Sequence, residues 1–544
     1  MSKIKSKRFG KGESCRRIYL IAPRHPNNFW TLQGVVDIMG SRTLMPNAAL
    51  ATLIALTDDD IDVEYILCDE NVSDIDWNMP CDLVAITGGT IHEKRIRELC
   101  FTFKEKGKQI ALGGSFASIN HNQCDGLADY LFIGEAEYLW PMFLRQWMEN
   151  RAKPVYIHET FINMKDSPAP DWSLINAGDY TNINIQTSRG CPHRCDFCDV
   201  IQYVGNRYRT KSIEQVLTEV KNAHEIGARY VFFSDDNFLG NKRFTKELLS
   251  ALIEWNNLQA RPLSFSTQIT INVADDDDLL RMFADAGFYV LFIGVETVRK
   301  ESLEEIHKGH NVKYDIAERI KRISRYGIVP FIGLIVGFDN DDITIFEDLY
   351  QFIENTSSPI AGISLLNAPK KTPLYERLKK EGRLMGDDFS GEWQLFTNVI
   401  PKNMSYEVLI KCYWELFRKI YEPDLFEKRL KKWLENVEYF PEHSSNKKCN
   451  IKHMYNFLMT VKYIAFEIDS AMRNFFVKNI AWTLRKNPRL IKTTLALLTY
   501  YSHFYDFVKN NAPDTIENVE LFDKTPHDMQ RQTLRLVREY NENT

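Results

Sequence analysis

The sequence has no apolar run long enough to cross a bilayer. A spanning helix needs about 18–20 predominantly apolar residues, whereas the most apolar short run covers only residues 329–338 and suits a buried strand better. The first residues, MSKIKSKRFGKGESCRR, are basic and polar and carry no apolar core of the signal-peptide type. These absences predict a protein without a transmembrane segment, located in the cytoplasm.

A large excess of charge of one sign is also missing. The 544 residues carry 68 Lys and Arg against 73 Asp and Glu, so the net charge is −5, which argues against a general nucleic-acid binder. A basic concentration lies in residues 1–15. We expect this segment to be a flexible arm, and a second interpretation is peripheral contact with an anionic membrane surface.

Residues 16–150 alternate strand-like and helix-like segments. The strand-like segments are RRIYLIAP, VEYILCDE, CDLVAITGG, QIALGGS and ADYLFIGEAE. This alternation predicts a doubly wound, Rossmann-like parallel sheet, followed by a proline-containing linker over residues 151–180. Ligands of such sheets bind at the carboxyl ends of the strands, and the residues at those ends are Gly88, Gly89, Gly113, Gly114, Gly134 and Glu135.

Residues 181–385 contain a second strand–helix alternation. The six strand candidates are NINIQTS, YVFFSDD, LSFSTQITI, YVLFIGVET, VPFIGLIVGF and AGISLLNAP. Six units are too few for a closed eight-stranded barrel and predict a partial (β/α)6 barrel, with the active site at the carboxyl ends of its strands. We expect Ser212 to be a simple helix N-cap, because Glu214 is one position away from a Ser-x-x-Glu capping box.

Residues 386–544 are predicted to be mostly helical. Aromatic residues recur at helical spacing at 413–440 and 455–486. Such stripes usually pack into a core and only rarely line a ligand pocket. The chain thus comprises an arm, a Rossmann-like domain, a linker, a barrel and a helical C-terminal region.

Three of the ten cysteines form a cluster, Cys191, Cys195 and Cys198, with the spacing C-x3-C-x2-C. The other seven are scattered and read as buried small side chains; they are Cys15, Cys68, Cys81, Cys100, Cys124, Cys412 and Cys449. A structural zinc site needs four ligands, and His193 is poorly spaced to be the fourth. Three thiolates suit a [4Fe–4S] cluster with one open iron; a zinc loop, an electron-transfer module or chance clustering are the alternatives.

The cysteine spacing after the first strand of a six-unit barrel resembles the radical S-adenosylmethionine (SAM) superfamily. The resemblance implies that the open iron binds SAM, that one electron cleaves it, and that the resulting 5′-deoxyadenosyl radical abstracts a hydrogen atom from the substrate. It also implies an electron donor such as flavodoxin or ferredoxin. The residues that it places at SAM are Phe197, Asp235, Asp236, Asn237, Gln268, Glu296 and Gly337.

A Rossmann-like domain directly before such a barrel resembles the cobalamin-binding radical SAM class. The resemblance implies cobalamin contacts at the strand-end residues Gly88, Gly89, Gly113, Gly114, Gly134 and Glu135, where glycine lets the backbone approach a ligand closely. Many cobalamin domains carry Asp-x-His-x-x-Gly, but here Pro23 precedes His25 by two residues. We therefore do not assign His25 as a cobalt ligand. A degenerate domain that binds no cofactor is the alternative.

Segments spread over residues 16–425 resemble the subgroup that contains the hopanoid methylases. These segments include LMPNAALATLIAL, SRGCPHRCDFCDVI, FIGVET and FIGLIVGFDNDD. The resemblance implies a C-methyltransferase that uses two SAM molecules and cobalamin to methylate unactivated carbon of a hydrophobic small molecule, such as a lipid or a tetrapyrrole. The alternative is a radical SAM enzyme that catalyses cyclisation, coupling or rearrangement, with or without cobalamin.

Overall fold

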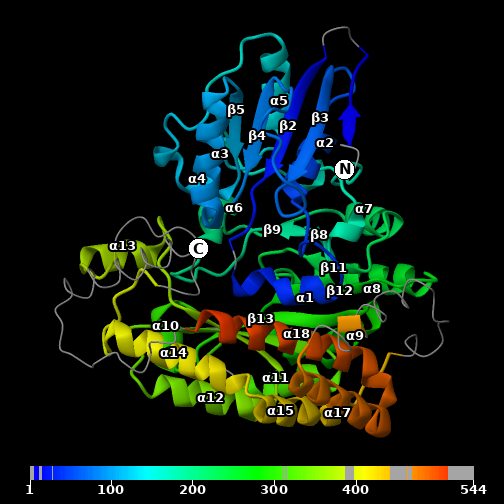
Figure 1. The fold of residues 1–544 in the computed structure, drawn as a ribbon, viewed down its shortest axis with the longest axis vertical. Coiled ribbons are helices and arrows are strands. Elements are labelled where there is room, and N and C mark those ends of the chain that lie inside the picture. Colours follow the sequence, from blue (N-terminus) through cyan, green and yellow to red (C-terminus); the bar gives the residue numbers. More distant parts are fainter. Residues whose placement is uncertain are drawn as a thin grey trace.

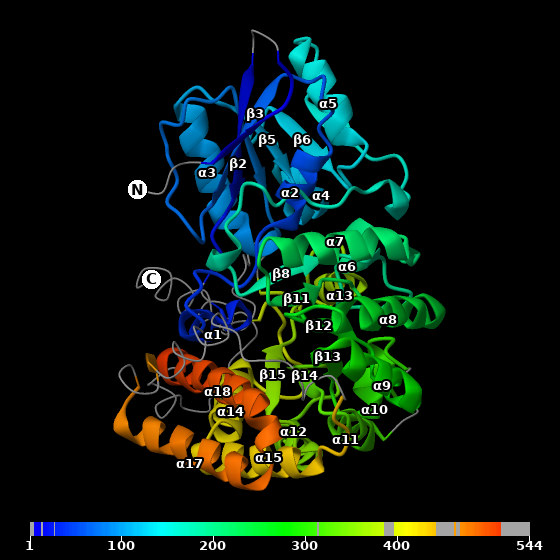
Figure 2. The same ribbon diagram turned by 90° about the vertical axis from the view of Figure 1, so that its right-hand side faces the viewer.

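The computed structural model describes residues 5–11, 15–26, 28–309, 311–312, 315–385, 397–441, 462–463 and 468–512. Three parts succeed one another along the long axis of the molecule: a sheet domain, a second sheet with its helices, and a group of C-terminal helices (Figure 1). The view turned by 90° shows the same order, with α1 (Gln33–Ile38) beside α18 (Ile491–Asn511) (Figure 2). Cys449 and most of the aromatic stretch at 455–467 lie outside the described residues.

The first domain is a seven-stranded sheet of order β1-β3-β2-β4-β5-β6-β7, in which only the β1 pairing is antiparallel. Its strands are β1 (Ser6–Arg8), β2 (Arg16–Ala22), β3 (Val63–Asp69), β4 (Leu83–Thr87), β5 (Gln109–Gly113), β6 (Tyr130–Ile133) and β7 (Val155–Ile157). Its helices are α2 (Ala48–Ala55), α3 (Glu93–Glu105), α4 (Ser115–Ile119) and α5 (Leu139–Met148). Helix α1 (Gln33–Ile38) follows β2 in the chain but packs against α18 beside the barrel (Figure 2). The predicted doubly wound sheet is confirmed.

Two edges of this sheet differ from the sequence expectation. The prediction of a flexible arm is wrong for Ser6–Arg8, which pairs with β3 as an edge strand. Ion pairs from Lys7 to Asp171 and from Arg8 to Asp62 hold it there, so its basic residues have partners across the sheet edge. Residues 1–4 and 12–14 lie outside the described residues. At the other edge, β7 brings part of the predicted linker into the sheet.

The second domain is the expected open barrel of six parallel strands, in the order β15-β14-β13-β12-β11-β8. Its strands are β8 (Asn182–Ile185), β11 (Tyr230–Phe233), β12 (Ser264–Ile269), β13 (Phe288–Glu296), β14 (Val329–Val336) and β15 (Ile360–Leu365). Its helices are α7 (Ile213–Glu225), α8 (Lys242–Asn257), α9 (Asp277–Ala286), α10 (Lys300–Glu305), α11 (Ile316–Arg325) and α12 (Ile345–Thr356). All six strand predictions are confirmed.

Local hydrogen bonds refine one helix start. Ser212 accepts a bond from the backbone of Gln215, whose side chain accepts one from the backbone of Ser212, at 3.2 and 2.9 Å. This is a capping box with glutamine in the third position. The expectation of a simple N-cap is therefore wrong, because the side chain of Gln215 serves as the reciprocal partner that glutamate provides in other capping boxes.

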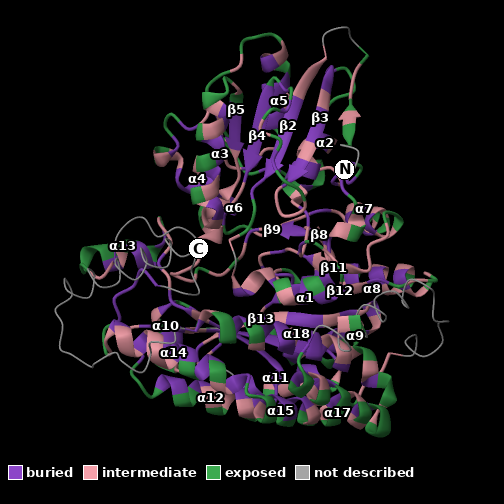
Figure 3. Cartoon of the chain, in the orientation of Figure 1, coloured by how far each residue is buried: buried purple, intermediate pink, exposed green. Residues whose placement is uncertain are grey.

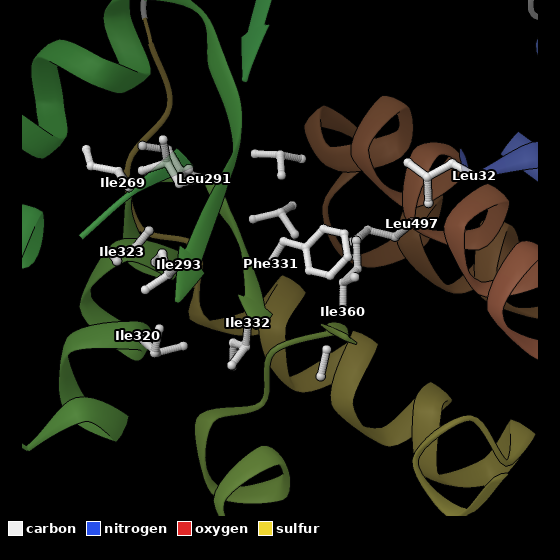
Figure 4. Close-up of a cluster of buried hydrophobic side chains, with 14 of the residues drawn as sticks. Leu32, Ile269, Leu291, Ile293, Ile320, Ile323, Phe331, Ile332, Ile360 and Leu497 are labelled. Atoms are coloured by element: carbon white, nitrogen blue, oxygen red, sulfur yellow. The ribbon is translucent and has the colours of Figure 1, made fainter. Parts of the chain in front are cut away.

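The C-terminal helices are α13 (Pro373–Lys380), α14 (Tyr406–Ile420), α15 (Pro423–Asn436), α17 (Ser470–Lys486) and α18 (Ile491–Asn511). Helices α14, α15 and α17 lie at the end of the molecule away from the first sheet, and α18 lies between them and α1 (Figure 1). Helix α13 lies beside the cysteine-bearing segment, where the N–H of Leu374 donates to the carbonyl oxygen of Asp196 at 3.1 Å. Their aromatic stripes are buried, including Tyr413, Trp433 and Phe504, as predicted. Figure 3 shows burial concentrated where the helices meet the sheets, and Figure 4 shows Leu497 of α18 facing the barrel side chains around Phe331.

The described helices include none with both the length and the apolar character that a bilayer crossing requires. Helix α18 is the longest at 21 residues, but it is buried against the barrel through Leu498, Tyr501 and Phe504. Its apolar residues are thus accounted for by packing within the protein.

Candidate functional site

The strand order places a ligand crevice between β2 and β4. The chain leaves β2 toward β3 on one side and later returns to β4 on the other, which creates a topological switch point where α/β sheets bind ligands. A cleft of about 720 Å³ opens there. Its lining comes from His25, Asp69 and His92 in the first domain and from Gln186 and Ser364 in the barrel. The two α/β domains therefore share one cleft.

His25 and His92 face each other at this switch point. The backbone N–H of Gly89 donates to His92 Nδ1 at 3.0 Å, so the proton of neutral His92 lies on Nε2, which reaches His25 Nδ1 at 2.9 Å. Burial lowers the pKa of both side chains, that of His92 to about 4. Metal-ligating histidines normally donate their second ring N–H, whereas His25 Nδ1 accepts here. The direction of this hydrogen bond is therefore not the one expected of a cobalt-ligating His25.

The predicted glycine positions lie at the same strand ends. Gly114 has φ +92° and Gly134 has φ +95°, so both occupy the left-handed region that favours glycine. A Cβ on Gly114 would lie 2.6 Å from Thr87 Oγ1, which shows how closely the β4 and β5 loops meet. These loops line a second cavity of about 280 Å³, which shares Thr87 and Gln186 with the large cleft. The two glycines thus allow these loops to pack closely beside the cavity, and their contact with cobalamin stays a prediction.

The three clustered cysteines lie on one loop after β8, between β9 (Ser188–Arg189) and α6 (Val200–Val204). Strand β9 pairs antiparallel with β10 (Arg209–Thr210), which follows α6, so the loop and α6 together connect the two strands. Asp235 fixes the start of β9, because its buried carboxylate accepts the backbone N–H groups of Thr187 and Ser188 at 2.7 and 3.0 Å. Asp236 accepts the N–H of Gly190 at 2.8 Å. The predicted acidic motif thus supports the cysteine loop directly.

Burial raises the pKa of all three thiols, to about 11 at Cys195 and about 12 at Cys198. Metal binding at such a site must displace protons. In the part of the chain that the structure describes, no three His, Cys, Asp or Glu side chains converge on a single ion. The ligation of a [4Fe–4S] cluster by the three thiols stays a prediction.

The other residues predicted at SAM surround this loop. Phe197 packs against Leu303 and Ile306 and also lines the large cleft. Asn237 is buried and accepts the N–H of Leu239, whereas Gln268 is exposed at the end of β12. Glu296 pairs with Lys308. Gly337 turns the chain after β14 with φ +109°. The structure brings these residues to the carboxyl ends of the barrel strands, and their contact with SAM stays a prediction.

Buried ion pairs connect the two domains beside the cysteine loop. Arg189 reaches Glu135 at 3.0 Å and Glu137 at 2.6 Å, and Arg209 also pairs with Glu135. Both carboxylates are 4% exposed. Burial acts to raise the pKa of Glu137, but Arg189 outweighs it and the net pKa is lowered. Glu135, predicted at cobalamin, thus has two arginine partners, and its side chain ties the β6 loop to the cysteine loop.

The comparisons with known proteins agree with this geometry. The family description "Radical SAM superfamily" matches residues 185–353, and "Domain of unknown function (DUF4070)" matches residues 372–515. The chain is 33% identical over 388 residues to the hopanoid C-2 methylase of Rhodopseudomonas palustris, covering 69% of this chain and 72% of the relative. The chain belongs to the radical SAM methyltransferase family. It is therefore an enzyme, and the predicted family is confirmed.

Two further matches extend over nearly the whole chain. An uncharacterized methyltransferase of Synechocystis is 30% identical over 505 residues, covering 90% of this chain and 92% of the relative. The solved structure of OxsB, a cobalamin-dependent SAM radical enzyme with aqua-cobalamin bound, gives a TM-score of 0.58 at 15% identity, covering 95% of this chain and 84% of that chain. The latter likeness concerns the fold, and it includes the order of the two α/β domains.

Sequence reasoning missed three side chains of this radical SAM site. His92, Arg189 and Lys308 contact predicted site residues, but none stands in a motif that marks its partner. Arg189 directly precedes the glycine before the first cysteine, so its position in the Arg-Gly-Cys run was the available signal. His92 and Lys308 come close to the site only through the fold.

Proposed function

We propose that this radical SAM enzyme is a cobalamin-dependent C-methyltransferase acting on unactivated carbon of a hydrophobic substrate. The observation that carries the proposal is the shared cleft: the cysteine loop contributes Phe197 to it and the sheet switch point contributes His25 and His92. A cluster held by the cysteines would lie beside this cleft, and the glycine turns line an adjoining cavity that shares Thr87 and Gln186 with it. The 33% identity to a hopanoid C-2 methylase supports the same reaction class.

The residues present divide the binding tasks. Cys191, Cys195 and Cys198 would hold the [4Fe–4S] cluster, and Gly114 and Gly134 would let the sheet domain approach cobalamin. When bound, the cluster, SAM and cobalamin supply the radical and methyl-transfer chemistry. A low-potential donor of the flavodoxin or ferredoxin type would deliver the electrons.

The cleft walls supply selectivity and keep water away. Trp30, Leu44, Met45 and Ile335 contribute apolar surface to the cleft, and Asn184 contributes an amide that can orient a polar group. Pockets of this kind bind molecules that are largely apolar, with a few polar groups that fix their orientation. This lining supports a hydrophobic substrate and the exclusion of water from a reactive radical.

The test compares the metabolites of a producing strain with those of a strain in which the gene is deleted. We expect the producing strain to contain a hydrophobic compound that is heavier by one methylene than its counterpart in the deletion strain. Complementation with wild-type protein should restore the compound, complementation with Cys195→Ala should not, and Cys412→Ala serves as the matched cysteine control. A product that differs by hydrogen content alone would contradict methylation and favour a radical cyclisation.

A further inference from the structure

A buried ion pair stands beside the cysteine loop, formed by Lys308 and by Glu296, which is also predicted to contact SAM. Lys308 pairs with the carboxylate of Glu296 and donates from Nζ to the carbonyl oxygen of Gly294 at 2.8 Å. The two side chains are only 9% and 12% exposed. Two full charges are therefore held together in a region of low effective dielectric, where they act strongly on their neighbours.

The backbone at Glu296 is strained to make this pair. Glu296 has φ +68°, a left-handed conformation that is uncommon for a residue other than glycine. The pairing of β13 with β14 shifts its register between Gly294 and Glu296. Such a conformation is unfavourable and persists where the surroundings enforce it, frequently at functional sites. The strain indicates that the position of the Glu296 carboxylate matters for function.

The segment that carries Lys308 is bonded to the cysteine loop. The N–H of Asp196, the residue after Cys195, donates to the carbonyl oxygen of Ile306 at 3.3 Å. His307 Nδ1 lies 2.8 Å from the Asp196 carboxylate. Lys308 follows Ile306 by two residues, so these contacts hold the ion pair on the segment that packs beside Cys195.

From this arrangement, and resting on the proposed function, we propose that Lys308 and Glu296 set the reduction potential of the cluster held by Cys191, Cys195 and Cys198. Reduction adds one electron to the cluster from a low-potential protein donor and breaks no bond. A buried ammonium stabilises the added negative charge, whereas a buried carboxylate opposes it. Lys308 and Glu296 are accordingly positioning residues with opposite effects on one equilibrium.

The test is a redox titration of the anaerobically reconstituted protein in the absence of SAM, followed by electron paramagnetic resonance of the reduced cluster. We expect Lys308→Met to lower the equilibrium constant for cluster reduction at least tenfold, which is about 59 mV for a one-electron couple. Glu296→Gln should raise it. Lys308→Arg, which keeps the charge, should stay close to wild type.

Arg429→Met is the matched control, because it breaks another buried pair, with Glu354 at 2.6 Å, in the helical region. It should leave the potential unchanged. Potentials that move in the same direction in Lys308→Met and Glu296→Gln, or do not move, would overturn the inference. If Lys308→Met does not retain its cluster, the reduction potential of Glu296→Gln is the deciding measurement. An unchanged or lowered potential in Glu296→Gln then overturns the inference. A wild-type protein that assembles no cluster would overturn the proposed function as well.

Discussion

The three thiols of the cysteine loop are the residues on which the proposed chemistry depends most. Their pKa values are raised by burial, so the loop without metal holds neutral thiols. Neutral thiols can be buried without counter-charges. Cluster assembly is then a proton-releasing step that depends on all three positions together.

Cys195→Ala should therefore abolish cluster assembly, because a loop with two thiols cannot hold a four-iron cluster. Iron and sulfide content after anaerobic reconstitution measures this directly. Cys412→Ala, in α14, is the matched control and should retain wild-type iron. A Cys195→Ala protein with a full complement of iron would show that the loop is not the cluster site.

Gly114→Ala should weaken the sheet end that we assign to cobalamin. The left-handed φ costs a non-glycine residue about 1–2 kcal/mol, and the new Cβ would also lie 2.7 Å from the carbonyl oxygen of Gly88. Gly107→Ala is the control, because Gly107 has φ +70° but open space around it. We expect a lower melting temperature and weaker cobalamin retention for Gly114→Ala than for Gly107→Ala; equal effects would contradict the steric argument.

At the scale of elements, α18 is fastened to the start of α1 by one histidine. His503 Nε2 donates to the carbonyl oxygen of Phe29 at 3.0 Å, and Nδ1 accepts the N–H of Gly34 at 3.3 Å. Phe504 stacks on Phe29 with ring centroids 4.6 Å apart. Because both ring nitrogens of His503 are used by a neutral imidazole, this contact requires the unprotonated form.

This contact predicts acid sensitivity. Burial lowers the pKa of His503 to about 4, below the unfolded value near 6.5, so the folded state binds fewer protons. Its stabilising contribution is complete above pH 6.5 and is lost as the pH falls toward 4, by about 3 kcal/mol in total. The melting-temperature difference between wild type and His503→Gln should shrink from pH 7.5 to pH 5. A constant difference would exclude protonation of His503 as a cause.

Elements with strong local signals could be predicted from sequence, and those that depend on distant partners could not. Strands β13 and β14 are nearly continuous apolar runs, which is typical of strands covered on both faces. Strand β1, by contrast, is a polar tripeptide that becomes a strand only because β3 offers it an edge. Lys308 likewise could not be predicted, because it stands in no recognisable motif. Its proposed role depends on Glu296, which the fold brings beside it.

At the scale of the whole molecule, the two α/β domains form one site because a buried ion network joins them. Arg189 belongs to β9, which leads into the cysteine loop, and its partners Glu135 and Glu137 belong to the first domain. These ion pairs therefore help to set the distance between the cysteine loop and the sheet switch point. The sequence could place each domain, but the relation between them depends on these contacts between distant residues.

Arg189→Met should leave two buried carboxylates without their shared partner and destabilise the protein by about 3–5 kcal/mol. Thermal unfolding of the metal-free protein measures the effect. Arg299→Met is the control, since Arg299 also pairs with two carboxylates, Asp342 and Asp348, but these are about half exposed; a loss of about 1 kcal/mol or less is expected there. Equal losses would contradict the assignment of a buried interdomain network.

The central claim is that this radical SAM enzyme transfers a methyl group from SAM to its substrate. The most direct measurement feeds methyl-deuterated methionine to producing cells and determines the mass of the product that the deletion strain lacks. We predict that the product carries an intact deuterated methyl group, because cobalamin-mediated transfer moves the methyl group as a unit. A product that contains no deuterium, formed while 5′-deoxyadenosine accumulates, would contradict methyl transfer and identify a different radical reaction.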